Sequence, residues 1–297
     1  IVHTVIKSDK IVTMKTGLIL EGGAMRGLFT AGVLDVFMVN DICFDGAIGV
    51  SAGAAFGCNI KSKQIGRVLR YNMAYCRDKR HASIFSLLLT GNLFSTKFNY
   101  NMLPYHLDLW DGETFEKNPM EFYCVATDVR TARPVYHKCT DGAKDDLLWI
   151  QGSASMPMVS RCVKVDGYEL LDGGISDSIP LRYFESIGYT KNVVVLTQPF
   201  GYRKQPYSSN MQKLMKVALA KSPLLLDKLL HRYEEYNACI DEILEKEAKG
   251  EIFVIRPPEA LNIPSVCRDP KEYKRVYDLG RRQALSQLHA LEQFLNK

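Results

Sequence analysis

The sequence predicts an α/β protein with three layers, in which helices cover a mostly parallel central sheet. Short apolar segments such as "GLIL" at 17–20 alternate with stretches of helical periodicity, which is the signature of βαβ units. The segment "KNVVVLTQ" at 191–198 is rich in β-branched residues, as expected of a strand buried on both faces. The composition of the 297 residues, 46% hydrophobic and 24% charged, fits a globular protein with a sizeable core.

The remaining elements follow from periodicity and turn signals. Strands are predicted over 17–20, 44–50, 121–129, 191–198 and 251–257, and a hairpin over 162–174. Helices are predicted over 27–40 and 52–60, from about 207 to Gly250 with a break near Pro223, and from about Pro270 onward. We therefore expect a catalytic domain over 16–198. A C-terminal helical region over 199–297, with one further strand, should pack on the same core.

Charge and cysteine usage exclude several classes of protein. The net charge of +5 is mild and the basic residues are scattered, so a nucleic-acid partner is not expected. The eight cysteines form no CxxC pair and no regular spacing, which predicts neither a metal site nor a disulfide framework and favours a reducing, cytoplasmic location. No run approaches the roughly 18 apolar residues of a membrane-spanning helix, so contact with membranes should be peripheral.

The segment Gly49-Val50-Ser51-Ala52-Gly53 matches G-x-S-x-G. In a nucleophile elbow the serine occupies a strained turn between a strand and a helix, and its neighbours must be small. The context here is right, because a predicted strand ends at Val50 and a helix of alanines and glycines follows. A simple turn with a capping serine remains the alternative interpretation of this motif alone.

A serine nucleophile needs a base, and the sequence offers two kinds. In the order Ser, Asp, His, the histidines that lie late enough are His231 and His289, both in charged helical stretches typical of a surface. The other candidate is Asp172 in "LLDGG", which follows an apolar strand. An aspartate becomes a competent base if burial raises its pKa, or if the serine proton moves as the bond to carbon forms. An ordinary Asp-Gly turn is the competing interpretation.

The loop "EGGAMRG" supplies candidate donors for an oxyanion. Gly22, Gly23 and Ala24 expose backbone N–H groups with little side-chain obstruction, and Arg26 follows them. The loop matches neither G-x-x-x-x-G-K-[ST] nor G-x-G-x-x-G, so no nucleotide cofactor is expected.

Together and in this order, "EGGAMRG", "GVSAG" and "DGG" resemble the pattern of the patatin-like phospholipase family. The resemblance covers roughly Thr16 to Ser186. It implies a Ser-Asp dyad without histidine that cleaves lipid acyl esters independently of calcium, needing no metal or other cofactor. Carried over by motif, Ser51 is the nucleophile and Asp172 the base. The other carried-over positions are the oxyanion residues Gly22, Gly23 and Ala24 and the supporting residues Arg26, Gly27, Gly49, Gly53 and Gly173.

Ala24 departs from the glycine that the resemblance leads one to expect at the third position of the loop. Alanine keeps its N–H, so the oxyanion site should survive provided that the φ angle of Ala24 is negative. Arg26 fits the basic position of the family pattern, where it is expected to brace the loop.

The substrate is less constrained by the sequence. The stretch 83–110 is unusually apolar and aromatic for a connection, and we hypothesise that Leu87 to Leu89 line an acyl groove or touch a membrane. Ordinary helices capping the core are the alternative. Beside the lipid hydrolase, a Ser-His-Asp esterase and a non-catalytic lipid-binding or partner-binding protein remain open as functions.

Overall fold

The structure is a computed structural model that describes residues 14–296. Its centre is an eight-stranded sheet with strand order β5-β6-β3-β2-β1-β7-β8, in which β4 also pairs with β3. The strands are β1 Lys15–Leu20, β2 Gly46–Val50, β3 Glu121–Asp128, β4 Pro134–Cys139, β5 Val163–Val165, β6 Tyr168–Asp172, β7 Tyr189–Val195 and β8 Ile252–Ile255. The five strands from β3 through β2, β1 and β7 to β8 run parallel, whereas β4, β5 and β6 join antiparallel. The prediction of a mostly parallel sheet is confirmed.

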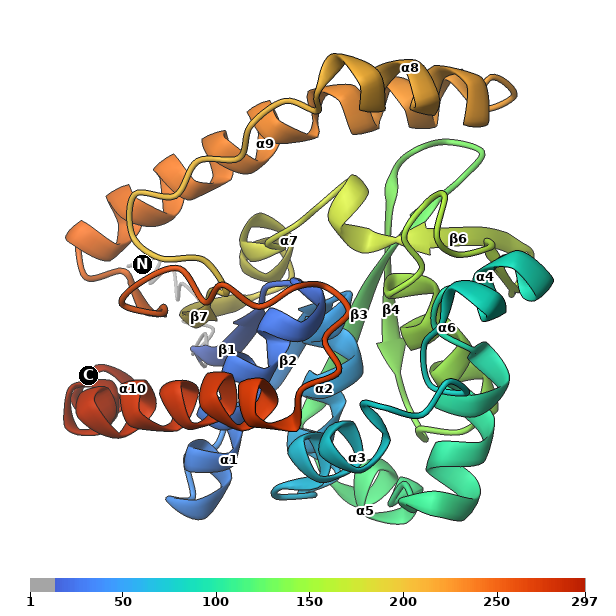
Figure 1. Cartoon of the computed structure of the whole chain (residues 1–297). Helices are drawn as coiled ribbons and strands as arrows, with labels where there is room; N and C mark the ends of the chain where they lie inside the picture. Colours follow the sequence, from blue (N-terminus) through green and yellow to red (C-terminus); the bar gives the residue numbers. More distant parts are fainter. Residues whose placement is uncertain (1–13, 297) are drawn as a thin grey trace, which may run out of the picture.

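Helices cover both faces of this sheet, which gives the predicted three layers (Figure 1). The α-helices are α1 Gly27–Val39, α2 Ala52–Lys61, α3 Arg67–Tyr75, α4 Ile84–Thr90, α5 Gly112–Lys117, α6 Lys144–Ser153, α7 Leu181–Ser186, α8 Ser209–Ala218, α9 Pro223–Ala248 and α10 Pro270–Asn296. Short 3-10 turns span Ala24–Arg26 (η1) and Gly173–Ile175 (η3), and a π-helical segment spans Phe98–Leu107 (η2). None of the described helices combines the length and the apolar character that crossing a bilayer requires.

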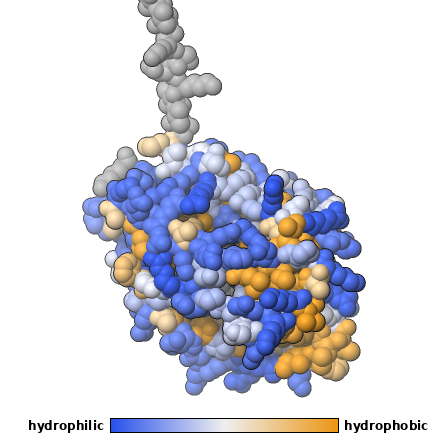
Figure 2. Space-filling view, turned by 90° about the horizontal axis from the view of Figure 1, so that it is seen from above, coloured by the Kyte–Doolittle hydropathy of each residue, from blue (hydrophilic) through white to orange (hydrophobic). Residues whose placement is uncertain are grey.

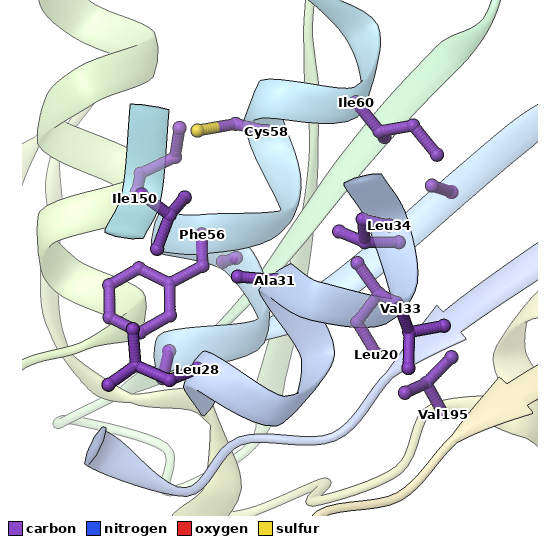
Figure 3. Packing of buried hydrophobic residues seen from close by; sticks show 14 of the residues in the cluster. Leu20, Leu28, Ala31, Val33, Leu34, Phe56, Cys58, Ile60, Ile150 and Val195 are labelled. Atoms are coloured by element: carbon purple, nitrogen blue, oxygen red, sulfur yellow. The ribbon is translucent and has the colours of Figure 1, made fainter. Parts of the chain in front are cut away.

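The alternation of residues along the strands divides the core in two. Leu18 and Leu20 of β1 face a large apolar cluster with α1, α2 and α10, whereas Ile19 faces a smaller cluster with α7 and α9. Figure 3 shows part of the larger cluster, where Leu28 of α1 lies beside Phe56 of α2. Because consecutive strand residues point to opposite faces, α9 covers the face opposite to α1 and α10.

The C-terminal region joins the same sheet. Strand β8 pairs in parallel with β7, and α10 packs along α1 (Figure 1). The predicted strand at 251–257 and the helices from 207 onward are therefore found. The boundary between 16–198 and 199–297 stays a prediction.

The structure confirms the predicted hairpin and contains two elements that the sequence did not predict. The hairpin over 162–174 is confirmed, with positive φ angles of 50° at Asp166 and 78° at Gly167. Strand β4 was not predicted, because it is half-exposed and mixes polar with apolar residues. Helix α6 was likewise not predicted, since its segment begins with three charged residues and carries no strong periodic pattern.

Candidate active site

The register of strand β3 brings the ends of β2 and β6 together. Strand β2 pairs with β3 as far as Val50 opposite Val125, and β6 pairs with β3 from Asp172 opposite Ala126. Because β4 occupies the other edge of β3 over the same residues, β6 continues along the edge that β2 leaves. Ser51, the residue after Val50, therefore meets Asp172.

Ser51 has the strained geometry expected of an elbow between a strand and a helix. Its φ of 55° and ψ of −121° lie outside the regions that L-residues favour, at a cost of about 1–3 kcal/mol. It stands at the N-cap of α2, and its backbone N–H donates to Ser153 Oγ at 2.9 Å. A Cβ on Gly49 would lie 2.4 Å from the carbonyl oxygen of Gly53, and one on Gly53 would lie 2.3 Å from that of Leu20. The predicted small residues are therefore sterically required.

Asp172 is buried, with 1% of its surface exposed. Its Oδ1 accepts a hydrogen bond from the Gly174 N–H at 2.8 Å, while its buried Oδ2 has no partner in good geometry among residues 14–296. Burial raises the pKa of Asp172 above its ordinary value, and the Arg232 charge, the Ser51 hydroxyl and the Gly174 N–H oppose this. The carboxyl group thus has the raised proton affinity that a base for a hydroxyl requires. The following residue is a glycine because a Cβ on Gly173 would lie 2.1 Å from the carbonyl oxygen of Val125.

The glycine-rich loop after β1 lies directly over Ser51. A Cβ placed on Gly22 would stand 2.9 Å from the Ser51 Cβ, so the loop backbone lies against the Ser51 side chain. The amides of Gly22, Gly23 and Ala24 donate to no acceptor in the described part of the chain. The Gly22 backbone thus lies beside Ser51, and the loop has free N–H groups of the kind that can serve an oxyanion.

Ala24 corrects one expectation. Its φ is +48°, so the condition of a negative φ is not met. A left-handed alanine costs roughly 1–2 kcal/mol, but the N–H is retained in this conformation. The expected negative φ is therefore wrong, and the loop carries strain at this position.

Arg26 lies in the 3-10 turn that precedes α1. Its backbone N–H donates to the Gly23 carbonyl at 3.1 Å, and its guanidinium lies 3.2 Å from where a Cβ on Gly23 would stand. The arginine thus packs along the loop, and its role in bracing the loop stays a prediction. Gly27 permits close packing on the elbow helix, because a Cβ there would lie 2.9 Å from that of Ala52.

The sequence that forms this site has counterparts among known proteins. The model of the patatin-like phospholipase family matches residues 18–185, which contain all three motifs. The chain belongs to the patatin-like phospholipase family. A second model, a domain of unknown function called DUF6363, matches residues 222–296.

Relatives differ in how much of their length this patatin-like chain covers. The uncharacterized protein YjjU of Escherichia coli is 31% identical over 90% of this chain and 75% of its own length. The patatin-like phospholipase domain-containing protein ZK370.4 of Caenorhabditis elegans is 25% identical, and the lysophospholipase nte1 of Aspergillus terreus 27%, each over 58% of this chain. The chain spans only 13% and 11% of these two proteins. Among solved structures, VipD of Legionella pneumophila matches 94% of this chain and 67% of its own at 12% identity, with a TM-score of 0.45.

Three residues that the sequence analysis missed hold the glycine-rich loop of this patatin-like protein. The buried Glu21 accepts hydrogen bonds from the Thr197 N–H at 2.6 Å and from the Tyr236 hydroxyl at 2.8 Å. The Thr197 hydroxyl also lies 2.9 Å from the Gly22 carbonyl, to which it donates. A charged residue between an apolar strand and a glycine pair was the one available signal for Glu21. Nothing local marks Thr197 or Tyr236.

The two candidate histidines lie elsewhere. His231 is exposed on α9 and its Nδ1 lies 2.9 Å from the Asp227 carbonyl oxygen, while His289 on α10 pairs with Gln293. Within residues 14–296, neither histidine has a hydrogen bond to Ser51 or Asp172. Both occupy the surface helix positions that the sequence indicated.

One group of side chains has the composition of a metal site. The ligand atoms of His137, Cys139 and Asp146 lie within 4.8 Å of one another. Asp146 already accepts hydrogen bonds from the His137 ring and from the backbone N–H groups of Thr140 and Gly142. These contacts explain the cluster by hydrogen bonding within the fold. The expectation that the protein has no metal site stays a prediction.

Two cavities are found in the described part of the chain. One, of about 390 Å³, is lined by Thr96, Lys97, Tyr100, Asn101, Tyr105, Lys144, Leu147, Leu148 and Gln151. The other, of about 190 Å³, is lined by Tyr202, Lys204, Gln205, Tyr207, Leu229, Arg232 and Tyr233. Neither lining includes Leu87 to Leu89, so these leucines do not form an acyl groove through either cavity. Instead α4, which lies at the right of Figure 1, exposes Ile84, Phe85, Leu88 and Leu89. The view from above in Figure 2 shows a patch of apolar surface at the lower right.

Proposed function

We propose that the protein is a serine-dependent hydrolase of lipid acyl esters, of phospholipase, lysophospholipase or carboxylesterase type, that uses a Ser51–Asp172 dyad. The observation that carries the proposal is the register at β3, which brings the strained Ser51 against a buried Asp172 whose Oδ2 has no partner among the described residues. A carboxylate held this way has a place for the serine proton. Family membership supports the lipid ester as substrate.

In the proposed reaction, Ser51 Oγ attacks the ester carbonyl carbon while its proton passes to Asp172 Oδ2. The amides of Gly22, Gly23 and Ala24 donate to the oxyanion of the tetrahedral intermediate. Collapse breaks the bond to the alcohol, which leaves with the proton from Asp172. Water then attacks the acyl-serine, gives a proton to Asp172, and the fatty acid is released as Ser51 Oγ regains that proton.

The catalytic parts are tested by covalent labelling with a fluorophosphonate probe. The native protein should be labelled at Ser51, and Ser51→Ala should not be labelled. The labelling rate of Asp172→Asn should be lower than that of the native protein by about 10³-fold or more. The double variant His231→Gln/His289→Gln is the matched control and should react like the native protein. Equal labelling of the native protein and both dyad variants would contradict the proposal, and loss of labelling in the double variant would restore the Ser-His-Asp alternative.

A panel of esters then separates a hydrolase from a binding protein. The native protein should release fatty acid from monoacyl and diacyl phospholipids or from long-chain carboxylic esters, and Ser51→Ala should not. If the native protein is labelled yet cleaves no ester of the panel, the non-catalytic alternative is favoured.

We further propose that the apolar face of α4 makes transient contact with a lipid surface that presents the substrate. The double variant Leu88→Ser/Leu89→Ser should lower hydrolysis of esters in vesicles and leave hydrolysis of short, dissolved esters unchanged. The pair was chosen because both leucines are more than 60% exposed and their replacement leaves the core intact. Unchanged hydrolysis of vesicle esters would refute this contact.

A further inference from the structure

The smaller of the two cavities, of about 190 Å³, is lined by two cationic side chains and by no carboxylate. Its lining contains two cationic residues, Lys204 and Arg232, together with tyrosines, a glutamine and a leucine, and no acidic side chain. Neither cation takes part in an ion pair with a carboxylate in the part of the chain that the structure describes. By contrast, two neighbouring basic residues form ion pairs, since Arg203 pairs with Asp241 and Lys228 pairs with Glu235. The cavity therefore offers cationic hydrogen-bond donors that can bind an anion.

Arg232 connects this cavity to the dyad. Its guanidinium lies 2.7 Å from where a Cβ on Gly174 would stand, and Asp172 Oδ1 lies 3.0 Å from the same point. Its hydrogen bond to Ser178 Oγ is long, at 3.5 Å, and its buried Nε has no partner among residues 14–296. The guanidinium is thus placed beside the catalytic carboxyl group and still has unused N–H groups.

Lys204 faces the same space. Its Nζ lies 4.2 Å from the centroid of the Tyr236 ring. The charged groups that act on it are Arg232 and Arg26, which repel it, and Glu21 and Asp172, which attract it. Burial and the two arginines lower the pKa of Lys204 to about 7. A bound anion would favour the protonated form of this lysine.

We propose that this cavity binds a phosphate group, and that Arg232 and Lys204 are its ligands. The inference rests on the proposed function and specifies it further, because the phosphate belongs to the alcohol half of the ester that Ser51 cleaves. A phosphate monoester carries between one and a half and two negative charges near pH 7, which two cations match better than a singly charged carboxylate does. The planar guanidinium can donate two parallel hydrogen bonds to it.

The location of the two ligands gives a role to the C-terminal region. Both residues lie outside the segment 18–185 that the patatin-like family model matches, and Arg232 lies within the domain of unknown function at 222–296. Helix α9 thus carries Arg232 to the cavity and Tyr236 to the glycine-rich loop from one face. The C-terminal region would thereby select among acyl esters by the charge of their head group.

Binding is measured on Ser51→Ala, which cannot turn the ligand over, by titration calorimetry. The probes are a monoacylglycerol phosphate and the monoacylglycerol with the same acyl chain, both below their aggregation concentration. The phosphate-bearing lipid should bind at least about tenfold more tightly, and adding Arg232→Gln or Lys204→Gln should remove most of this difference. Lys204→Arg, which keeps the charge, should retain the difference in affinity between the two lipids. Arg203→Gln is the matched control and should leave it unchanged.

The pH dependence and the anion source give two further readouts. The preference for the phosphate-bearing lipid should fall between about pH 7 and 9, because free Lys204 loses its proton there, and Lys204→Arg should abolish this fall. Inorganic phosphate should compete with the lipid at millimolar concentration if a head group is the natural ligand. Saturation by inorganic phosphate at micromolar concentration would instead show a site for free phosphate and overturn the head-group assignment.

Equal affinity for the two lipids, or a preference that survives both charge-removing variants, would overturn the phosphate site. These outcomes are separable from failure of the proposed function. If the native protein is labelled at Ser51 and cleaves both lipids at equal rates, the hydrolase stands and the phosphate site falls. If the phosphate lipid is preferred in binding but no ester is cleaved, the site stands and the hydrolase falls.

Discussion

The two faces of the sheet both bury apolar residues but differ in how their helices approach it. On one face α1 and α10 pack so closely that a Cβ on Gly280 would lie 2.0 Å from the carbonyl oxygen of Phe29, and one on Gly32 would lie 2.1 Å from that of Tyr277. On the other face α9 packs through apolar residues such as Ile240 and Ile243 and adds a buried polar contact, since Tyr236 donates to the buried Glu21. Close packing favours stability, whereas buried polar contacts fix positions and charges. We infer that the first face holds the fold and the second tunes the site.

The largest expected effect is on the dyad itself. Asp172→Asn should lower the rate of fluorophosphonate labelling by about 10³-fold or more, because amide nitrogen cannot accept the serine proton. The same variant should be more stable at neutral pH by about 1 kcal/mol, or roughly 2–4 °C in Tm, measured by calorimetry. The raised pKa of Asp172 means that its ionised form opposes folding.

The sign of this stability effect follows from the direction of the pKa shift. A carboxyl group whose pKa is raised in the folded protein contributes most favourably below its unfolded pKa of about 4, and this contribution is lost as the pH rises through the folded value. The advantage of Asp172→Asn should therefore grow with pH above about 4. A destabilised Asp172→Asn variant at pH 7 would show that the charge interaction with Arg232 outweighs burial.

The next effect tests the face that α9 covers. Tyr236→Phe removes the hydroxyl that donates to Glu21 and should cost about 1–3 kcal/mol of unfolding free energy, because a buried carboxylate loses a partner. Since Glu21 also holds Thr197, and Thr197 holds the Gly22 carbonyl, the labelling rate should fall about tenfold. A native labelling rate in folded Tyr236→Phe would break the link between α9 and the glycine-rich loop.

The close-packed face should respond differently. Gly280→Ala forces a methyl group against the Phe29 backbone and should cost about 1–3 kcal/mol of stability, measured by urea unfolding. The labelling rate per folded molecule should stay native, since α10 makes no described contact with the dyad. A slower rate in the folded variant would show that both faces tune the site.

The smallest effect is a shift in pH dependence. Asp172 must be ionised to accept the serine proton, so the labelling rate should fall as the pH drops through its raised pKa. The positive charge of Arg232 lowers this pKa, and Arg232→Gln should therefore move the acid limb to higher pH. Arg203→Gln, whose guanidinium pairs with Asp241, is the control and should leave the limb in place.

The sequence by itself determined the local parts of the site. The sequence predicted the strand, glycine-rich loop and helix at 17–40, and the strand, serine and helix at 44–60. Each depends on adjacent residues, because turn strain and steric crowding act over a few positions. The alternation of apolar and helical segments also sufficed for the α/β class. The sequence did not predict the positive φ of Ala24, since this angle depends on how the loop packs over Ser51.

Only the tertiary structure decided what surrounds these parts. The meeting of Ser51 with Asp172 depends on where β6 continues the edge of β3 that β2 leaves, which is a matter of strand register. Tyr236 reaches Glu21 from 215 positions away, and no local pattern can encode such a contact. Short-range steric effects can be predicted from neighbouring residues of the sequence. Strand register, burial and the charges that set the pKa of Asp172 and Lys204 arise only when distant segments pack together.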